Sequence, residues 1–560
     1  MKITEQMQTD VLVIGAGGGG LRAALAAAEA GSQVLLVNKG PVARSGITLT
    51  AAGGMQAPFA AGDDPERYFT DTIENGYYLA DQNLVKVLAE DACARALDAE
   101  RFGARLVRDT AGDLQCKQFP GQSKPRNLFF KGGGVGLAAA LARACRNHDR
   151  ITVVDDFYVS GLLKSQDLPG AAAGALGLDL RRGGLTQINA KAVVVATGGF
   201  QWLWAVNDCP ADATGDGLVQ AYRLGAELVD MEMVLFYPTV IVWPESVKGA
   251  FVHYEFLSPE MLDGNVYDKN GQPILPKPLP VRDTAMRLMA GAIADGRGTD
   301  RGGVLWSVAD SPKGTDAIRK MLNLAQYNYI RAHGLEPATD QVETAPGAHY
   351  LMGGIHIDET CRTSVPGLFA AAECAGNFDG ANRLAGNGIT ATQVFGARAG
   401  LTAHAWAAAN GPMAVDTAVQ EQETARVAAK VSTRPCQETS LVPLRDKLRA
   451  ATQTYAGVNR NADGLLRLVT AAREVQLAAS EIQVADQAVF NQQLVDLLQL
   501  ETLCEAAGLV AGSALLRQES RGHHYRTDFP QQNDVFWRQH TLAYKLETGP
   551  RFTVKPVVKL

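Results

Sequence analysis

The sequence predicts an α/β protein of two or three domains whose C-terminal part is helical. Its 560 residues exceed what one hydrophobic core usually serves. A strand, a glycine-rich turn and an alanine-rich helix follow one another at 11–31. From about residue 416, apolar residues recur at intervals of three and four, which is typical of amphipathic helices. The STRP run at 432–435 is expected to interrupt these helices.

The first strand, turn and helix carry the pattern of a Rossmann-type dinucleotide-binding unit. The segment VLVI (11–14) is continuously apolar, as expected for a strand buried on both faces. Gly15 allows the turn, Gly17 lets the backbone approach a pyrophosphate, and Gly20 lets the helix pack closely. A second strand, QVLLV (33–37), completes the unit and places phosphates at the helix N-terminus. A plain βαβ turn is the alternative interpretation.

The end of the second strand departs from the usual dinucleotide pattern. An acidic residue normally stands there and holds a ribose hydroxyl, whereas this chain has Asn38 followed by Lys39. An amide can still accept that hydrogen bond. The replacement of this acidic residue by Asn38 weakens the interpretation of the unit as an NAD-binding site.

Composition and charge exclude several classes of protein. Hydrophobic residues make up 46%, charged residues 20%, and the net charge is -6, which argues against nucleic acid as the main partner. The N-terminus, MKITEQMQTD, has no signal core, and no run approaches the ~18 to 20 apolar residues of a membrane span. We therefore expect a cytoplasmic protein with no membrane span of its own.

The cysteines indicate neither a metal site nor an iron–sulfur cluster within this chain. They form no CxxC pair and are scattered as an unpaired set suited to a reducing compartment. They stand at positions 93, 116, 145, 209, 361, 374, 436 and 504.

Six segments carry a resemblance to a known family. They are NKGPVARSGITLTAAGGM (38–55), KAVVVATGGF (191–200), TGDGLVQAYRLGAELVDMEMVLFYPT (214–239), HYLMGGI (349–355), VPGLFAAAECAGNFDGANRLAGNGITATQVFGARAG (365–400) and SRGHHYRTDFPQQNDVFWRQHTL (520–542). Through them the chain resembles the flavoprotein subunits of succinate dehydrogenase and fumarate reductase, a family that includes L-aspartate oxidase. The resemblance covers nearly the whole length, with departures that make this chain a divergent member.

The resemblance implies a particular arrangement of domains. A Rossmann-type FAD-binding domain (1–240 and 345–415) is interrupted by an α+β capping domain (241–344). A C-terminal helical domain and tail (416–560) follow. Within the first domain, the low-complexity stretch PGAAAGALG (169–177) is expected to form a surface hairpin or loop.

The cofactor implied by the resemblance is FAD. Asp216 would hold a ribityl or ribose hydroxyl and Glu373 a ribose hydroxyl. Many relatives attach FAD covalently to a histidine in the loop after the second strand, but no histidine lies between 38 and 56 here. We therefore expect non-covalent FAD, as in L-aspartate oxidase, and no metal. The expected cofactor-binding residues are Gly15, Ala16, Gly17, Gly20, Asn38, Lys39, Gly46, Thr48, Gly53, Gly54, Thr197, Gly198, Asp216, Glu373, Arg383, Asn387, Gly388 and Ile389.

The resemblance also assigns the catalytic residues. Arg282, in VRD, matches the family's proton-donating arginine, and His349 matches a substrate-binding histidine. Arg383, in GANRL, matches the arginine that clamps a substrate carboxylate, which its planar fork can do bidentately. Tyr237 stands where the family has histidine, and it donates one hydrogen bond without a positive charge at neutral pH.

A second departure concerns the proton relay. The family's TEGCRGEGG segment carries a glutamate and an arginine that pass protons to the catalytic arginine. Here the region reads GAFVHYEFLSPEMLDGNVYDKNG (249–271), and that arginine is missing. His253 and Glu255 lie near the expected place and are candidates to replace the relay.

The implied function is an FAD-dependent oxidoreductase that acts on CH–CH groups. A hydride would pass between flavin N5 and a carbon next to a carboxylate of a small substrate. Tyr237 disfavours a strict succinate or fumarate enzyme and favours a related unsaturated or amino acid. The alternative is an oxidase or dehydrogenase of the L-aspartate oxidase type, acting on a C–N bond. Adenylylsulfate reductase ranks lower because it lacks the GANRL context, and Arg282, His349 and Arg383 argue against a non-catalytic flavoprotein.

The resemblance finally implies a role in electron transport with a partner. The helical domain and the SRGHHYR tail resemble those that relatives use beside an iron–sulfur subunit, while this chain lacks cluster ligands. An iron–sulfur subunit is therefore the favoured partner, and partner subunits could hold the chain at the inner face of a membrane. Direct reaction with oxygen or a soluble donor is the alternative.

Overall fold

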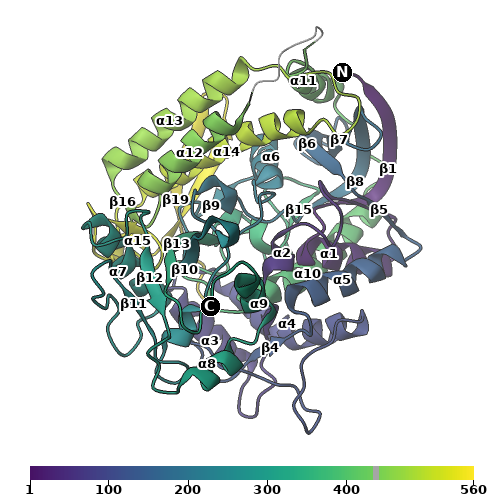
Figure 1. Ribbon diagram of the computed structural model, residues 1–560. Helices are drawn as coiled ribbons and strands as arrows, with labels where there is room; N and C mark the ends of the chain where they lie inside the picture. Colours follow the sequence, from purple (N-terminus) through teal and green to yellow (C-terminus); the bar gives the residue numbers. More distant parts are fainter. Residues whose placement is uncertain (433–439) are drawn as a thin grey trace.

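A mixed sheet forms the centre of the large N-terminal part of the chain (Figure 1). The computed structural model describes residues 1–432 and 440–560. The strand order is β5-β2-β1-β8-β7-β6, and β15 pairs with β8 beyond the end of β7. The β5, β2, β1, β8 and β15 strands are parallel, whereas β6, β7 and β8 pair antiparallel. These strands are β1 (Ile3–Ile14), β2 (Val34–Val37), β5 (Ile151–Val154), β6 (Phe157–Lys164), β7 (Ala172–Asp179), β8 (Leu185–Val195) and β15 (Leu368–Ala370).

The β7 strand decides the expectation of a surface hairpin or loop at 169–177: β6 and β7 form an antiparallel hairpin, but β7 is buried. Most of this stretch is buried strand, paired on both sides with β6 and β8. Small residues fit here because the neighbouring chains approach closely: a Cβ on Gly174 would lie 1.9 Å from the Ile188 carbonyl oxygen, and one on Gly177 would meet Phe157. The composition rich in glycine and alanine therefore predicts the hairpin, while its predicted position at the surface is wrong.

Helices pack beside this sheet, and glycines set how closely they approach. The α1 helix contacts both α5 and α10 (Figure 1). A Cβ on Gly20 would lie 1.8 Å from the Gly15 carbonyl oxygen, and one on Gly396 would lie 2.6 Å from that of Gly19. The elements of this layer are α1 (Gly18–Glu29), α2 (Ile47–Thr50), β3 (Gly54–Gln56), α3 (Pro65–Asn75), α4 (Gln82–Arg101), β4 (Asn127–Phe129), α5 (Gly133–Arg146), α6 (Asp216–Leu224), η4 (Ala372–Cys374) and α10 (Asn387–Ala409).

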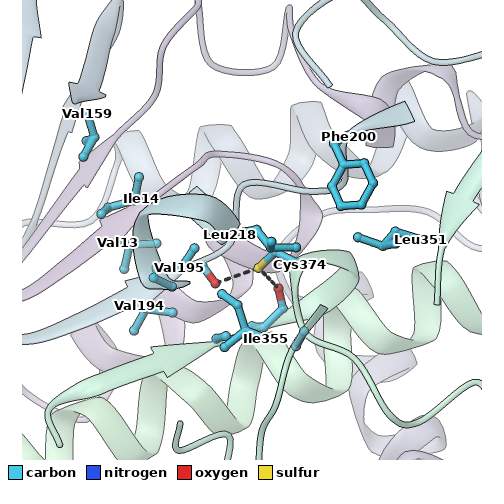
Figure 2. Close-up of a cluster of buried hydrophobic side chains, with 14 of the residues drawn as sticks. Val13, Ile14, Val159, Val194, Val195, Phe200, Leu218, Leu351, Ile355 and Cys374 are labelled. Atoms are coloured by element: carbon cyan, nitrogen blue, oxygen red, sulfur yellow. Dashed lines mark hydrogen bonds between the residues drawn. The ribbon is translucent and has the colours of Figure 1, made fainter. Parts of the chain in front are cut away.

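The core continues beneath the first glycine turn. Figure 2 shows Val13 and Ile14 beside Val194, Val195 and Leu218, together with Cys374. The Cys374 thiol lies 3.1 Å from the Val195 carbonyl oxygen and 3.2 Å from that of Ala371. Burial raises its pKa to about 11. Cys374 therefore contributes to packing rather than to redox chemistry.

A second sheet and its helices form a cap with a hydrophobic core of its own. The strand order is β10-β13-β12-β11, all antiparallel. The β10 and β13 strands run through the predicted cap limits at 241 and 344 without a break, and these limits stay a prediction. The elements are β10 (Val234–Trp243), η2 (Glu245–Val247), η3 (Tyr254–Leu257), β11 (Asn265–Tyr267), α7 (Arg282–Ala294), β12 (Val304–Ser307), α8 (Thr315–Met321), α9 (Ala325–Ala332) and β13 (Val342–Leu351). The short η1 (Gln201–Leu203), which belongs to the first core, contacts β13.

The described residues of the C-terminal part are mainly helical up to residue 516, and three of the helices lie side by side in yellow-green (Figure 1). They are α12 (Val442–Tyr455), α13 (Ala462–Ser480) and α14 (Gln492–Leu516), and they are preceded by α11 (Thr417–Ala428). The predicted STRP break lies, apart from Ser432, outside the described residues. Across 1–432 and 440–560, no helix is both long and apolar enough to cross a membrane.

The tail after α14 folds back into the molecule. Its strands complete a sheet of order β14-β9-β18-β19 and a short β16–β17 pair. Of the SRGHHYR motif, Ser520, Arg521, His523, His524 and Arg526 are all buried. These buried side chains cannot form a surface for a partner. The SRGHHYR motif is therefore wrong as direct support for a partner subunit. The elements are β9 (Leu228–Val229), β14 (Gly354–Ile355), β16 (Asn459–Arg460), β17 (Tyr525–Arg526), α15 (Asp534–Trp537), β18 (Gln539–Leu546) and β19 (Gly549–Pro556).

Candidate active site

The first glycine turn has the geometry that a pyrophosphate needs. Gly15 has a φ of +99°, and a Cβ there would lie 2.4 Å from the Ala196 carbonyl oxygen. The α1 helix begins without a side-chain cap, although the Gly18 N–H donates to Thr48 Oγ1 over 2.9 Å. The α10 helix, which also begins without a side-chain cap, lies beside it: a Cβ on Gly18 would be 3.0 Å from Thr392 Oγ1. Two adjacent helix N-termini favour an anion.

The residues after the second strand form hydrogen bonds within the protein. Asn38 Oδ1 accepts from the Ala16 N–H over 2.9 Å, and its amide nitrogen donates to Gly40 and Ser45. The Asn38 side chain thus braces the glycine turn instead of extending freely toward a ribose. The Lys39 ammonium bonds to Asp216 over 2.7 Å, so these two predicted cofactor residues lie together.

Several predicted cofactor residues carry buried polar atoms that lack a protein partner in the described part of the chain. They include Thr197 Oγ1 and Asn387 Nδ2, and nearby Gln56 Oε1 is another. Gly53 and Gly198 both have positive φ, of +77° and +73°. Unpartnered buried polar atoms and left-handed glycines around two helix N-termini fit a large dinucleotide with many acceptors and donors.

Glu373 lies beside the end of β13, next to the predicted cofactor residues. Its carboxylate accepts from the Leu351 N–H over 3.0 Å and from the Gln201 amide, and a Cβ on Gly199 would be 2.9 Å from Glu373 Oε1. Burial raises the Glu373 pKa to about 7. Gly388 is also close to Arg383, because a Cβ there would lie 2.9 Å from Arg383 Nη1.

A cleft between the cap and the FAD-binding part brings two predicted arginines together. Arg282 and Arg383 both line it. The other lining residues are Tyr254, Glu255, Pro280 and Val281 from the cap, and Asn75, Pro120, Asn382 and Ala385 from the opposite side. Two cations in one small cleft can bind carboxylates.

Glu255 organises the cap side of this cleft. Arg282 Nε donates to Glu255 Oε1 over 2.9 Å, with a second, shorter contact through Nη2. Burial raises the Glu255 pKa, but the positive charge of Arg282 outweighs it and holds that pKa at about 2. Burial alone would lower the Arg282 pKa, whereas Glu255 raises it above its usual value. Glu255 is therefore an anion that keeps Arg282 charged.

Tyr237 faces Glu255. Its hydroxyl donates to Glu255 Oε2 over 2.9 Å and accepts from the Tyr254 N–H over 3.1 Å. Tyr237 does not line the cleft, although the sequence predicts it to be part of the substrate site. His253, the other relay candidate, bonds through Nδ1 to the Tyr327 hydroxyl over 3.0 Å. Of the two candidates, Glu255 is the one that bonds to Arg282.

His349 contacts Arg383 directly. Arg383 Nη2 donates to His349 Nε2 over 3.1 Å, and the Arg383 guanidinium carbon lies 4.3 Å from the centre of the Tyr350 ring. His349 Nδ1 lies 2.7 Å from Asp208 Oδ2.

Two contacts around the site involve residues that the sequence does not single out. Asp208 bonds to His349, and Tyr77 reaches across from the FAD-binding part to donate to buried Asp283, next to Arg282, over 2.7 Å. Asp208 sits in an irregular segment with no periodic signal, so spacing alone could not have identified it. In the described chain, no group of three or more His, Cys, Asp or Glu side chains could hold a metal ion.

This arrangement defines a class of protein: a dinucleotide-dependent oxidoreductase with a capped, cationic substrate cleft. Comparisons with known proteins agree with it. A family model described as FAD binding domain matches residues 10–389, and one described as fumarate reductase flavoprotein C-term matches 445–559. The chain belongs to the fumarate reductase and succinate dehydrogenase flavoprotein family. It is an FAD-dependent oxidoreductase of this type, which acts on CH–CH groups.

Individual relatives cover the chain almost end to end. A fumarate reductase (CoM/CoB) subunit of Methanothermobacter marburgensis is 33% identical over 98% of this chain and 99% of the relative. An L-aspartate oxidase of Caulobacter vibrioides is 31% identical over 97% and 98%. The solved structure of a variant of FrdA from Escherichia coli quinol fumarate reductase matches with a TM-score of 0.90 at 28% identity, over 100% and 98%. The predicted fold class and family are thereby confirmed.

Proposed function

We propose that this chain interconverts a carbon–carbon single and double bond next to a carboxylate, within a complex that contains partner subunits. The observation that carries this proposal is the pair Arg282 and Arg383, which line one cleft from opposite sides. Bound FAD would supply the hydride chemistry at N5. Arg383 binds the substrate carboxylate, and Arg282 donates a proton to the carbon on the opposite face.

The surroundings of Arg282 support its role as the proton donor. An arginine is a weak acid. To act as a proton donor, its guanidinium must be held in a fixed orientation and must be reprotonated by a neighbouring group. Glu255 provides both, because its carboxylate bonds to Nε and Nη2 and lines the same cleft. The Tyr237 hydroxyl donates to the second oxygen of Glu255. The exchange of the family's histidine for Tyr237 therefore changes which group hydrogen-bonds to the proposed proton relay.

Anaerobic titration of the flavin tests the proposed reaction. The dithionite-reduced flavin should be reoxidised by fumarate or by a related unsaturated carboxylate, as followed by its visible absorbance. L-aspartate, tested on the oxidised flavin, serves as the discriminating substrate. Reduction by L-aspartate together with inertness toward every unsaturated acid would overturn the proposal and establish chemistry at a C–N bond.

That second function keeps one specific observation in its favour. The L-aspartate oxidase relative covers nearly the whole chain at 31% identity. Where the family has histidine, this chain has Tyr237, which carries no positive charge at neutral pH and donates to Glu255. An amino acid, which carries its own positive charge, would need fewer cations around it.

We further propose that FAD is bound without a covalent link. The loop at 38–56 contains no histidine, cysteine or tyrosine that could form one. Acid precipitation should therefore release all the yellow colour into the supernatant, measured as flavin absorbance. Colour retained in a washed protein pellet would contradict this prediction.

An iron–sulfur subunit is the partner that we propose. The Methanothermobacter marburgensis relative is named as one subunit of its enzyme, which points to an assembly. Because the SRGHHYR motif is buried, the contact must use other residues, and the side chains of Val535 and Phe536 on α15 are 84% and 67% exposed. Purification from the native source at low salt should co-isolate a cysteine-rich protein with iron–sulfur absorbance. A lone chain that turns over with oxygen at full rate would contradict this assignment.

A further inference from the structure

Asp208, His349 and Arg383 form a continuous chain of hydrogen bonds that ends at the substrate cleft. Asp208 Oδ2 lies 2.7 Å from His349 Nδ1, and His349 Nε2 lies 3.1 Å from Arg383 Nη2. The Asp208 side chain is 2% exposed, whereas that of His349 is 25% exposed. Asp208 is held in place by its backbone, since Asn207 pairs with Ala348 and the Asp208 N–H donates to the Ala348 carbonyl.

The position of the proton on His349 follows from the chemistry of its neighbours. A guanidinium can donate hydrogen bonds but cannot accept them. His349 Nε2 must therefore present its lone pair to Arg383. Its proton lies on Nδ1 and is donated to the Asp208 carboxylate. In this state His349 is neutral and has no hydrogen to offer to a substrate.

A carboxylate bound by Arg383 would lie beside this neutral imidazole, because His349 Nε2 is 3.1 Å from Arg383 Nη2. The lone pair on His349 Nε2 would repel the carboxylate, and it engages one of the two Nη2 hydrogens of Arg383. Protonation of Nε2 removes both obstacles, because Nε2 then donates to the anion and the engaged Nη2 hydrogen is freed to do the same. Arg383 Nε, which has no protein partner in the described structure, remains a further donor.

We propose that Asp208 is a positioning residue that couples carboxylate binding to uptake of a proton by His349. The proton comes from solvent and binds at Nε2, while Asp208 balances the new charge on the imidazolium through Nδ1–H. The inference rests on the proposed function, because it requires a carboxylate in the same cleft. It adds that the anion and the proton bind together.

The other titratable groups around His349 do not bond to its ring nitrogens in the described structure. Tyr237 has its ring centre 5.4 Å from that of His349, and burial, followed by the charge of Glu255, raises its pKa well above the usual value. Cys209 lies 3.4 Å from the His349 carbonyl oxygen, and burial likewise raises its pKa. Glu373 accepts from the Leu351 N–H, and the His523 ring nitrogens lie against Met286 and Asn382 rather than against the His349 ring. Asp208 is thus the acid in direct contact with the imidazole.

The test measures proton uptake when the FAD-loaded protein binds malonate. Malonate is a dicarboxylate too short to contain the CH–CH bond between two carboxylates, so it binds without reacting. Calorimetry in two buffers of different ionisation enthalpy should show uptake of about one proton per malonate, and log Kd should rise by about one per pH unit while free His349 is neutral. Binding with no proton uptake would overturn the inference and leave the proposed function standing. Failure of malonate to bind at any pH would overturn the proposed function itself.

Variants separate Asp208 from the other acids. Asp208→Asn keeps a hydrogen-bond acceptor but loses the charge, so malonate affinity should fall about tenfold and its pH dependence should flatten. Asp208→Glu should restore the pH dependence, whereas Asp212→Asn, in the same loop, should leave it unchanged. A wild-type pH profile in Asp208→Asn would refute the role of Asp208. If that variant fails to hold FAD, proton uptake by the wild-type protein decides the question.

Discussion

Replacing Arg282 with alanine is expected to lower turnover by about 10²–10⁴-fold while FAD stays bound, because general acid catalysis contributes roughly that factor. Arg282 begins α7, so its backbone is anchored by the cap, and both contacts of its guanidinium go to Glu255. Its side chain is 19% exposed, which places the charge at the cleft rather than in bulk solvent. Removing it deletes the donor and leaves Glu255 with the Tyr237 hydroxyl alone among its side-chain partners in the described structure.

The measurement is steady-state turnover with the substrate found by flavin titration, together with FAD content from the visible spectrum. Arg301→Ala is the matched control, because Arg301 also lies in the cap, stacks on Trp243 and is 55% exposed. Arg383→Ala should behave differently and chiefly weaken binding, by about 2 to 4 kcal/mol. Near-normal turnover in Arg282→Ala would show that the proton comes from another group.

The parts of the fold that follow from local sequence rules could be predicted. The GxGxxG turn can be recognised from its glycine spacing. That spacing is required because a Cβ on Gly15 or Gly20 would collide with a backbone oxygen. The helices after residue 416 were recognised because their apolar residues keep a helical period. Arg282 and Arg383 were singled out by their motifs, and the structure places both in one cleft although they are 101 residues apart in the chain.

Features that depend on tertiary contacts could not be predicted from the sequence. The β7 strand lacks the alternation of a half-buried strand because both of its faces are covered, and its small residues resemble a loop. Tyr237 was assigned to the substrate, yet its hydroxyl bonds to Glu255, which lies 18 residues away. Asp208 reaches His349 across 141 residues. The contact between Tyr237 and Glu255 follows from packing within the cap, and that between Asp208 and His349 from an irregular segment that packs on β13, so no local spacing encodes either contact.

The tail is expected to depend on Arg517 more than on any single apolar contact. The Arg517 side chain is fully buried and bonds to Glu232 over 2.6 Å, Glu519 over 3.1 Å and Asp230 over 3.3 Å. Arg517→Met should lower the free energy of unfolding by about 3–5 kcal/mol, because buried carboxylates then lose their charge partner. Glu519 would keep Arg521 and Asp230 would keep His540, whereas the Glu232 side chain would keep, among the described residues, only the Thr541 hydroxyl. Glu232 would therefore be the most destabilised of the three carboxylates.

Urea unfolding of the FAD-saturated protein measures this loss. Arg182→Met is the control, because Arg182 forms an ion pair with Glu5 but its side chain is 70% exposed, and surface pairs contribute about 0–1 kcal/mol. A Glu232→Gln change in the Arg517→Met background should recover part of the stability, because it removes the buried charge that the first substitution leaves unpaired. Equal losses in Arg517→Met and Arg182→Met would mean that buried ion pairs do not hold the tail. The burial of the SRGHHYR motif would then have to come from packing alone.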